Sequence, residues 1–222
     1  MLWVAGTGLH LGFTLYIMSL WINHTTFNIQ HSNPAWFIPV VGNIIVPIAG
    51  VEHGMVEVSW FFFSIGIVFW IILFTIFMYR IIFHPPLAAK LVPTLFILLA
   101  PPAVGFVSYV KLMEHSGVGG AVVPFAIDPL ARVLYYLALF IGMLLLAQVR
   151  MFARLEFFLS WWAYSFPVAA LTIATILMFH KTDLPFFSGL ATLLLVLLSG
   201  IIGLLVWRTA QAIGQREICV EE

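Results

Sequence analysis

The residues best suited to act on a solute are gathered in one segment, residues 33–50. Its sequence, NPAWFIPVVGNIIVPIAG, contains three prolines, two glycines and two asparagines within an apolar stretch. Because proline lacks an N–H and clashes with the preceding turn, a helix here should be bent and should leave carbonyl oxygens without their usual donors. Those carbonyls and the Asn43 side chain could bind water or a passing solute. The alternative, which spacing alone favours, is close helix packing through small residues such as Gly42.

Prolines recur in every second apolar stretch from the second onward. The interrupted stretches, at 36–51, 91–113 and 156–178, contain Pro39, Pro47, Pro93, Pro101, Pro102 and Pro167. The stretches that follow them, at 58–79, 131–148 and 184–207, have no internal break. This alternation predicts a helix hairpin used three times. In hydrocarbon a carbonyl freed by proline needs another partner, so we expect the interrupted helices to face a bundle interior or an aqueous path.

The composition indicates a membrane protein. Hydrophobic residues make up 63% of the 222 residues, charged residues 8%, and the mean hydropathy is +1.12. A span needs roughly 20 predominantly apolar residues, and the stretch at 2–22 has neither a basic start nor a cleavage site typical of a signal peptide. We therefore predict an all-α transmembrane fold with one membrane domain over 1–222, a tail at 208–222, and spans at 2–22, 36–51, 58–79, 91–113, 131–148, 156–178 and 184–207.

The basic residues predict the orientation of the chain. One side collects Arg80, Lys90, Arg150, Arg154, Arg208 and Arg216, whereas the side of Met1 has Lys111, Arg132 and Lys181. The positive-inside rule then places the C-terminus in the cytoplasm and the N-terminus outside, in a multi-pass protein of the plasma (inner) membrane. An outside N-terminus without a targeting signal indicates that an odd number of upstream spans is missing. A natural seven-span protein is the alternative that stays open.

Several function classes lack the residues that they need. The single cysteine, Cys219, forms no intrachain disulfide, and a formal net charge of zero gives no nucleic-acid-binding surface. No lysine lies in the last span for a retinal Schiff base, and no facing histidine pairs indicate haem. Glu52, His53 and Glu57 form a turn cluster that is more typical of a solvated helix end than of a metal site. We predict no enzyme activity and no cofactor.

The order and wording of several motifs resemble a known family. The segments are NPAWFIPVVGNIIVPIAG, EVSWFFFSIG, LVPTLFILLAPPAVGFVSY, LYYLALFIGMLLL and SWWAYSFPVAALTIAT. They resemble the tellurite-resistance and dicarboxylate transporter family, which includes TehA, the malic acid permease and the plant slow anion channel. The resemblance implies ten spans in five hairpins around a quasi-fivefold pore, and a homotrimer. The seven spans here would match spans four to ten, so that the chain would be a truncated, non-conducting fragment.

The resemblance also implies roles for particular residues. The phenylalanine before the proline of the ninth span gates the pore in this family, and Phe166 matches it in the sequence SWWAYSFPV. Proline disfavours helical geometry in the residue before it, which would aim the Phe166 ring into the lumen. Bending and lining of the pore helices would then fall to Pro39, Gly42, Asn43, Pro47, Pro101, Pro102 and Pro167.

The few ionisable residues at mid-depth favour passive flow of small anions over coupled transport. Such residues mark ion sites or proton relays, and His10, the main one here, is expected to be a hydrogen-bonded packing residue. Helix N-terminal dipoles would attract the anion, and partial dehydration would admit it. The alternatives are a proton-coupled, malate-type dicarboxylate carrier and a tellurite-resistance exporter. The predicted partners are the lipid bilayer, small anions and two further copies of the chain.

Overall fold

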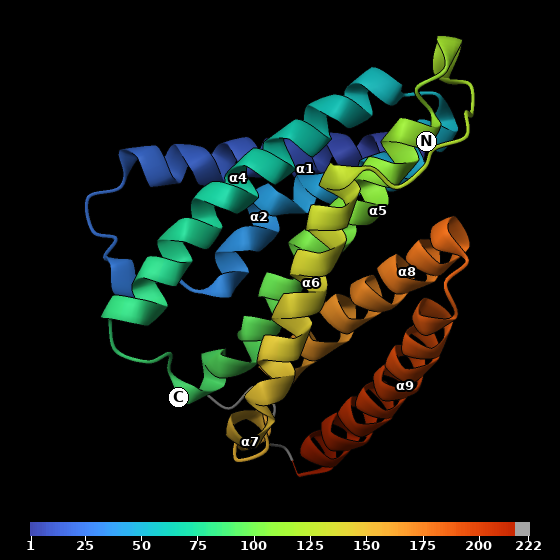
Figure 1. Cartoon of the computed structure of the whole chain (residues 1–222). Helices are drawn as coiled ribbons and strands as arrows, with labels where there is room; N and C mark the ends of the chain where they lie inside the picture. The colour runs from blue at the N-terminus through green and yellow to red at the C-terminus, as the bar shows by residue number, and fades with distance from the viewer. Residues whose placement is uncertain (216–222) are drawn as a thin grey trace.

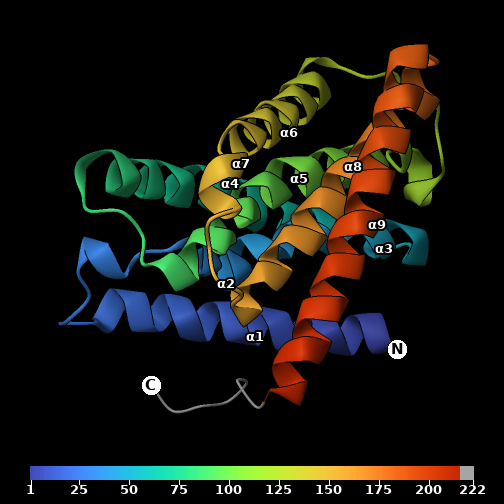
Figure 2. The same ribbon diagram turned by 90° about the horizontal axis from the view of Figure 1, so that it is seen from below.

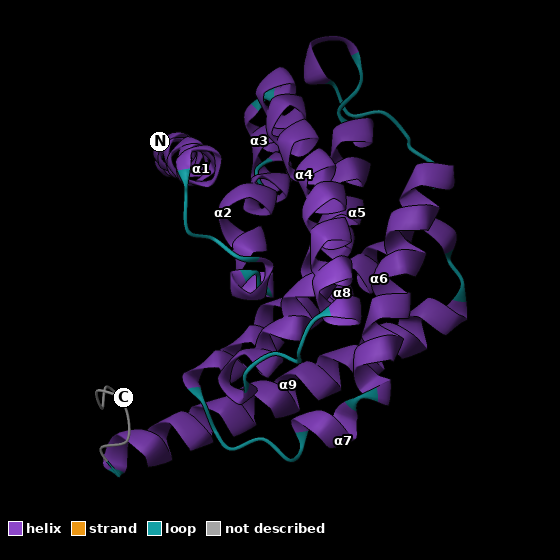
Figure 3. Cartoon of the chain, turned by 90° about the vertical axis from the view of Figure 1, so that its left-hand side faces the viewer, coloured by secondary structure: helices purple, strands orange, loops and turns teal. Residues whose placement is uncertain are grey.

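A computed structural model of the chain describes residues 1–215. The described residues form helices and loops without any strand (Figure 3), and seven of the helices are long and apolar enough to cross a membrane. The predicted all-α transmembrane fold with seven spans is therefore confirmed. Arg216 and Cys219, on which the predictions about the tail rely, lie outside the described residues. The spans are α1 (Leu2–Asn23), Pro34–His53, α4 (Val56–Phe83), Ala89–Glu114, α6 (Pro129–Ala147), Leu159–Thr182 and α9 (Pro185–Gly214).

The helices extend further than the apolar stretches that predicted them. The helix α4 continues to Phe83, past the expected end at 79, and α9 continues to Gly214, past 207. Polar residues such as Arg and Gln are good helix formers, so a helix does not end where its hydrophobic run ends. The sixth span begins at Leu159 and not at Glu156, because Phe158 before it is extended. Short helices lie in the connections: η1 (Ile29–His31), η6 (Val118–Gly120) and α7 (Val149–Phe152).

Each proline-containing span changes from a 3-10 helix to an α-helix at an equivalent position. The pairs are η2 (Pro34–Trp36) with α2 (Phe37–Val41), η5 (Ala89–Leu99) with α5 (Ala100–Glu114), and η7 (Leu159–Tyr164) with α8 (Ser165–Thr182). The first α-helical residue of each pair donates its N–H to the carbonyl three residues back, at Pro34, Ile97 and Trp162. The second span changes further, through η3 (Gly42–Ile45), α3 (Pro47–Gly50) and η4 (Val51–His53).

The position of the change corrects one expectation about Phe166. We expected Pro167 to keep Phe166 out of helical geometry, but Phe166 is the second residue of α8 and the change of helix type precedes it, at Tyr164. Proline is tolerated in the first turn of an α-helix because its missing N–H costs little there. The 3-10 segment before it supplies bonds over three residues, so the chain need not leave the helix.

Three hairpins and one additional helix make up the bundle. The helices α8 and α9 lie side by side along their length (Figures 1 and 2), α5 packs on α6, and the second span packs on α4. The fourth span lies centrally, because it contacts both the second and the sixth spans. The helix α1 lies at one edge of the bundle, against the second span (Figure 2), and its buried residues are Thr7 and Thr14.

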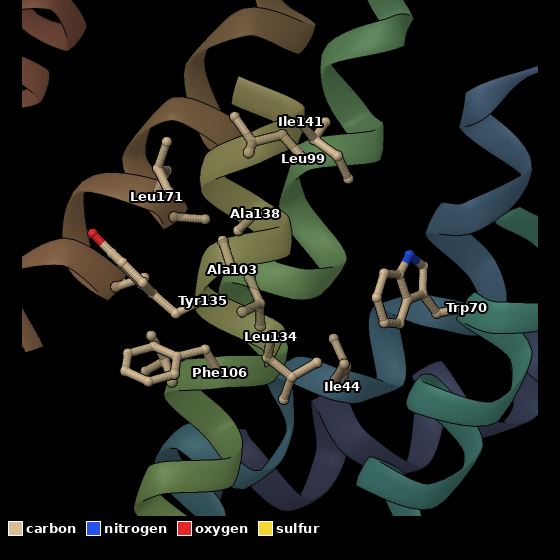
Figure 4. Packing of buried hydrophobic residues seen from close by; sticks show 14 of the residues in the cluster. Ile44, Trp70, Leu99, Ala103, Phe106, Leu134, Tyr135, Ala138, Ile141 and Leu171 are labelled. Atoms are coloured by element: carbon tan, nitrogen blue, oxygen red, sulfur yellow. The ribbon is translucent and has the colours of Figure 1, made fainter. Parts of the chain in front are cut away.

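The core lies where α5 meets its neighbours. Phe106 of α5 is fully buried, and its ring centroid lies 5.4 Å from that of Tyr135 on α6. Figure 4 shows these two side chains together with Leu171 of α8 and Ile44 of the second span. In lipid, packing and interhelical hydrogen bonds drive helix association, because the surrounding tails are themselves apolar. The packing around α5 therefore holds the three hairpins together and fixes the inner faces of the proline-containing helices.

Candidate functional site

A cavity of about 610 Å³ lies between the three proline-containing spans. The outer helices α4, α6 and α9 contribute no residue to its lining, whereas α1 contributes His10. The wall is therefore built mainly from the inner helix of each hairpin. The residues from those inner helices are Ala35, Phe37, Ile38, Val41, Gly42, Ile44, Ile45, Thr94, Ile97, Ala100, Pro101, Val104, Ser160, Ala163, Phe166 and Pro167.

Four of the predicted site residues lie in the cavity wall: Gly42, Pro101, Phe166 and Pro167. Phe166 leaves 53% of its surface exposed, although the neighbouring Pro167 is buried. Because α8 begins at Ser165, the Phe166 ring is held within the first turn of a helix. The structure thus places Phe166 at the cavity wall with about half of its surface exposed.

The other four predicted residues, Pro39, Asn43, Pro47 and Pro102, do not line this cavity. Asn43 is fully buried behind the wall. Its Nδ2 donates to Oγ1 of Thr14 at 2.9 Å and to the carbonyl oxygen of Val40 at 2.7 Å. The Asn43 amide thus joins α1 to the second span, which is the helix-packing role that the sequence left open for this segment.

Polar side chains are few in the cavity wall. Thr94 and Ser160 each donate a 2.6 Å hydrogen bond from the hydroxyl to a backbone carbonyl, of Leu91 and Lys90 respectively. Among the described residues that line the cavity, none is an aspartate, glutamate, lysine or arginine. The wall therefore presents little fixed charge to a solute, and an anion would meet no carboxylate in it.

The starts of α5 and α8 at this cavity are not free helix ends. The α-helices α5 and α8 begin inside longer helical spans, and their first N–H groups already donate to carbonyls of the preceding 3-10 helices. A helix dipole attracts anions through N–H groups that have no intrahelical partner. The N-terminal ends of α5 and α8 are therefore poor sources of positive potential for a solute in the cavity.

His10 separates this cavity from a second one of about 380 Å³. The second cavity lies between α1 and the second span and shares His10, Gly42 and Ile45 with the first. A Cβ atom on residue 42 would lie 3.1 Å from both Cε1 and Nε2 of His10, so the close approach of the ring depends on glycine. Nε2 is buried without a hydrogen-bond partner among the described residues. His10 thus packs as expected, but Nε2 lacks the expected hydrogen bond.

Ion pairs gather at the end of the bundle where the N-terminus lies. Lys111 Nζ lies 2.8 Å from Glu52 Oε1, and Lys181 Nζ lies 2.6 Å from Glu114 Oε1. Lys181 also donates to the carbonyl oxygen of Phe125 at 3.2 Å. Within residues 1–215, no group of three potential metal ligands is present, and Glu52 pairs with Lys111 at a helix end.

Sequence reasoning did not single out Ile38. This side chain lines the cavity and is 56% exposed, much like Phe166. A signal was available: IPVVG at 38–42, PPAVG at 101–105 and FPVAA at 166–170 align without gaps. The alignment places Ile38 at the position of Phe166.

Comparisons with known proteins agree with this architecture. A family model described as voltage-dependent anion channel matches residues 1–210. The S-type anion channel SLAH2 of Arabidopsis thaliana is 30% identical over 145 residues, which cover 65% of this chain and 26% of that protein. The guard cell S-type anion channel SLAC1 of the same plant is 23% identical over 176 residues, covering 79% and 30%.

A larger share of an archaeal relative is matched by this chain. The uncharacterized transporter MJ0762 of Methanocaldococcus jannaschii is 28% identical over 191 residues, which cover 80% of this chain and 55% of the transporter. The matched region thus spans about a quarter to about half of these three relatives. The family resemblance stated from the motifs is confirmed. Since the family model matches nearly the whole chain, this membrane protein belongs to the SLAC1 family of voltage-dependent anion channels.

Proposed function

We propose that the chain conducts small monovalent anions passively across the bilayer, through the cavity between its proline-containing helices, with Phe166 as the gate. The observation that carries the proposal is the half-exposed ring of Phe166 in the wall of that cavity. Two relatives, SLAH2 and SLAC1 of Arabidopsis thaliana, are S-type anion channels, which supports the class of solute.

The gate would work by excluding water. An aromatic ring in a narrow apolar tube removes the polar contacts that a hydrated ion needs, and such constrictions block conduction by dewetting. The cavity lining also includes Ala163, Ile97 and Val104, which offer no polar side chain to compensate. Turning the ring away, or removing it, would let water and anions pass.

Passive conduction fits the wall better than coupled transport does. A proton-coupled dicarboxylate carrier needs a titratable coupling group and a cationic partner for the substrate carboxylates. No arginine or lysine lines the cavity among the described residues, and His10 is the one titratable side chain there. A proton-coupled carrier is the second candidate function, because a transported proton could bind to the imidazole of His10 in the cavity wall.

We further propose a multi-pass arrangement in the plasma (inner) membrane, with a cytoplasmic C-terminus and a homotrimeric assembly. The distribution of lysine and arginine between the two ends supports the orientation. The outward faces of α1 and α9, which are largely exposed and apolar, support contact with lipid or with other copies of the chain.

The test is anion efflux from vesicles that contain the purified 222-residue chain. Chloride, nitrate and malate are compared, each with and without an imposed proton gradient, for the unaltered chain and for Phe166→Ala. The proposal predicts that chloride and nitrate leave down their own gradients and that Phe166→Ala raises their rates several-fold. Malate that moves only with a proton gradient would establish the carrier instead. Absence of flux from both proteins would contradict transport by this chain.

A further inference from the structure

The three changes from 3-10 helix to α-helix repeat one local arrangement. In each, the third residue of the α-helix is a proline, and the second residue comes directly before it. The pairs are Ile38 with Pro39, Pro101 with Pro102, and Phe166 with Pro167. The sequences IPVVG, PPAVG and FPVAA coincide with this register. The three motifs therefore repeat in the structure as well as in the sequence.

The second residue of each α-helix lines the same cavity. Ile38, Pro101 and Phe166 all belong to its wall. Ile38 and Phe166 are similarly exposed, at 56% and 53%, whereas Pro101 is buried. The two exposed side chains at this repeated position thus come from the second and sixth spans, both of which contact the fourth.

We infer that Ile38 forms the second wall of the constriction that Phe166 gates, so that these two side chains together set its width. The inference rests on the proposed function, since it specifies the same pore. It adds a residue that limits the size of the permeating anion.

The two side chains are suited to different parts in such a constriction. Isoleucine is β-branched, and in a helix its χ1 angle is held to one rotamer in roughly 90% of cases. Ile38 lies within α2 and would therefore act as a wall of fixed shape. The flat ring of Phe166 can reorient about its χ angles, and it would act as the moving part. Pro101 is buried and has a short closed ring, so it projects little into the cavity.

Other apolar residues of the wall do not share this position. Ile45 and Ile97 lie in the 3-10 segments η3 and η5, away from the repeated start of the α-helices. Ile173 on α8 is 55% exposed, which matches Ile38, but it lies outside the cavity lining. Ile173 therefore provides a control for the loss of an exposed isoleucine from a helix of the same bundle.

The experiment measures nitrate efflux from vesicles for Ile38→Ala, Ile38→Phe and Ile173→Ala, each alone and combined with Phe166→Ala. A shared constriction predicts that Ile38→Ala raises efflux several-fold over the unaltered chain, whereas Ile173→Ala leaves it unchanged. It also predicts that Ile38→Phe lowers the raised efflux of Phe166→Ala, because an aromatic ring is restored in the wall of the same cavity. Thermal unfolding of every variant in detergent shows that the efflux differences come from folded protein.

The outcomes separate this inference from the proposed function. If Phe166→Ala raises efflux while the Ile38 variants behave like Ile173→Ala, the gate stands and the role of Ile38 is wrong. If Phe166→Ala is silent and Ile38→Ala is silent as well, both are wrong. If Ile38→Ala raises efflux while Phe166→Ala is silent, Ile38 lines a constriction whose gate is another residue, and the pairing with Phe166 is overturned.

Discussion

The hydroxyl of Ser108 on α5 donates a 2.6 Å hydrogen bond to the carbonyl oxygen of Ile44 in η3. In a 3-10 helix this carbonyl would accept from the residue three positions on, but that residue is Pro47, which has no N–H. A side chain from the neighbouring span thus partners a carbonyl beside a proline, at a fully buried position. Such partners are what allow irregular helices at membrane depth.

Ser108→Ala should destabilise the protein by about 1–3 kcal/mol, the cost of leaving a buried acceptor without its partner. Thermal unfolding in detergent measures the change. Ser64→Ala is the matched control, because Ser64 is exposed and donates to the Trp60 carbonyl of its own helix. Equal stability losses for the two variants would show that the hydrogen bond of Ser108 between the spans contributes no more than a hydrogen bond within one helix.

Gly66→Ala should be strongly destabilising. A Cβ atom at residue 66 of α4 would lie 2.6 Å from the backbone nitrogen of Ile44, which a flexible side chain cannot relieve. Overpacking of this kind typically lowers stability by about 1–3 kcal/mol, because the added methyl group would push α4 away from the second span. Gly203→Ala on α9 is the control, because a Cβ there would meet nothing within 4 Å. Unchanged unfolding of Gly66→Ala would contradict the close approach of the two spans.

Thr14→Val should loosen α1 from the rest of the bundle. Oγ1 of Thr14 accepts from Asn43 Nδ2 at 2.9 Å and lies 2.7 Å from the carbonyl oxygen of Pro39. Interhelical hydrogen bonds in membrane proteins average about 0.6 kcal/mol, so we expect faster amide hydrogen exchange in α1 with a small loss of global stability. Thr192→Val on α9, where the hydroxyl bonds only within its own helix, should leave the exchange of α1 unchanged. Exchange in α1 that is the same for all three proteins would refute the role of this contact.

The proposed orientation can be tested with the one cysteine of the chain, Cys219. In intact cells that express the protein, a membrane-impermeant maleimide should label Cys219 only after permeabilisation, because basic residues predict a cytoplasmic tail. Cys219→Ser, which should not label, is the control. Labelling of intact cells would reverse the predicted orientation.

The sequence predicted the spans because each one must be long and apolar to cross lipid. It did not predict the change of helix type before Pro39, Pro102 and Pro167, because these spans are apolar on most faces and carry little periodicity that could distinguish a 3-10 helix from an α-helix. Contacts such as that between Ser108 and Ile44 join residues 64 positions apart and leave no local signal. The role proposed for Phe166, one of 21 phenylalanines, came from the family motif, and the structure adds that this residue lines a cavity.

The gate is tested most directly by varying the size of the side chain at residue 166. Nitrate efflux is measured for Ala, Leu and Trp at this position beside the original phenylalanine, in vesicles with equal amounts of folded protein. A gate at Phe166 predicts that efflux falls in the order Ala, Leu, Phe, Trp, since a larger apolar side chain closes and dewets the constriction more fully. Efflux that is the same for all four side chains would contradict a gate at Phe166.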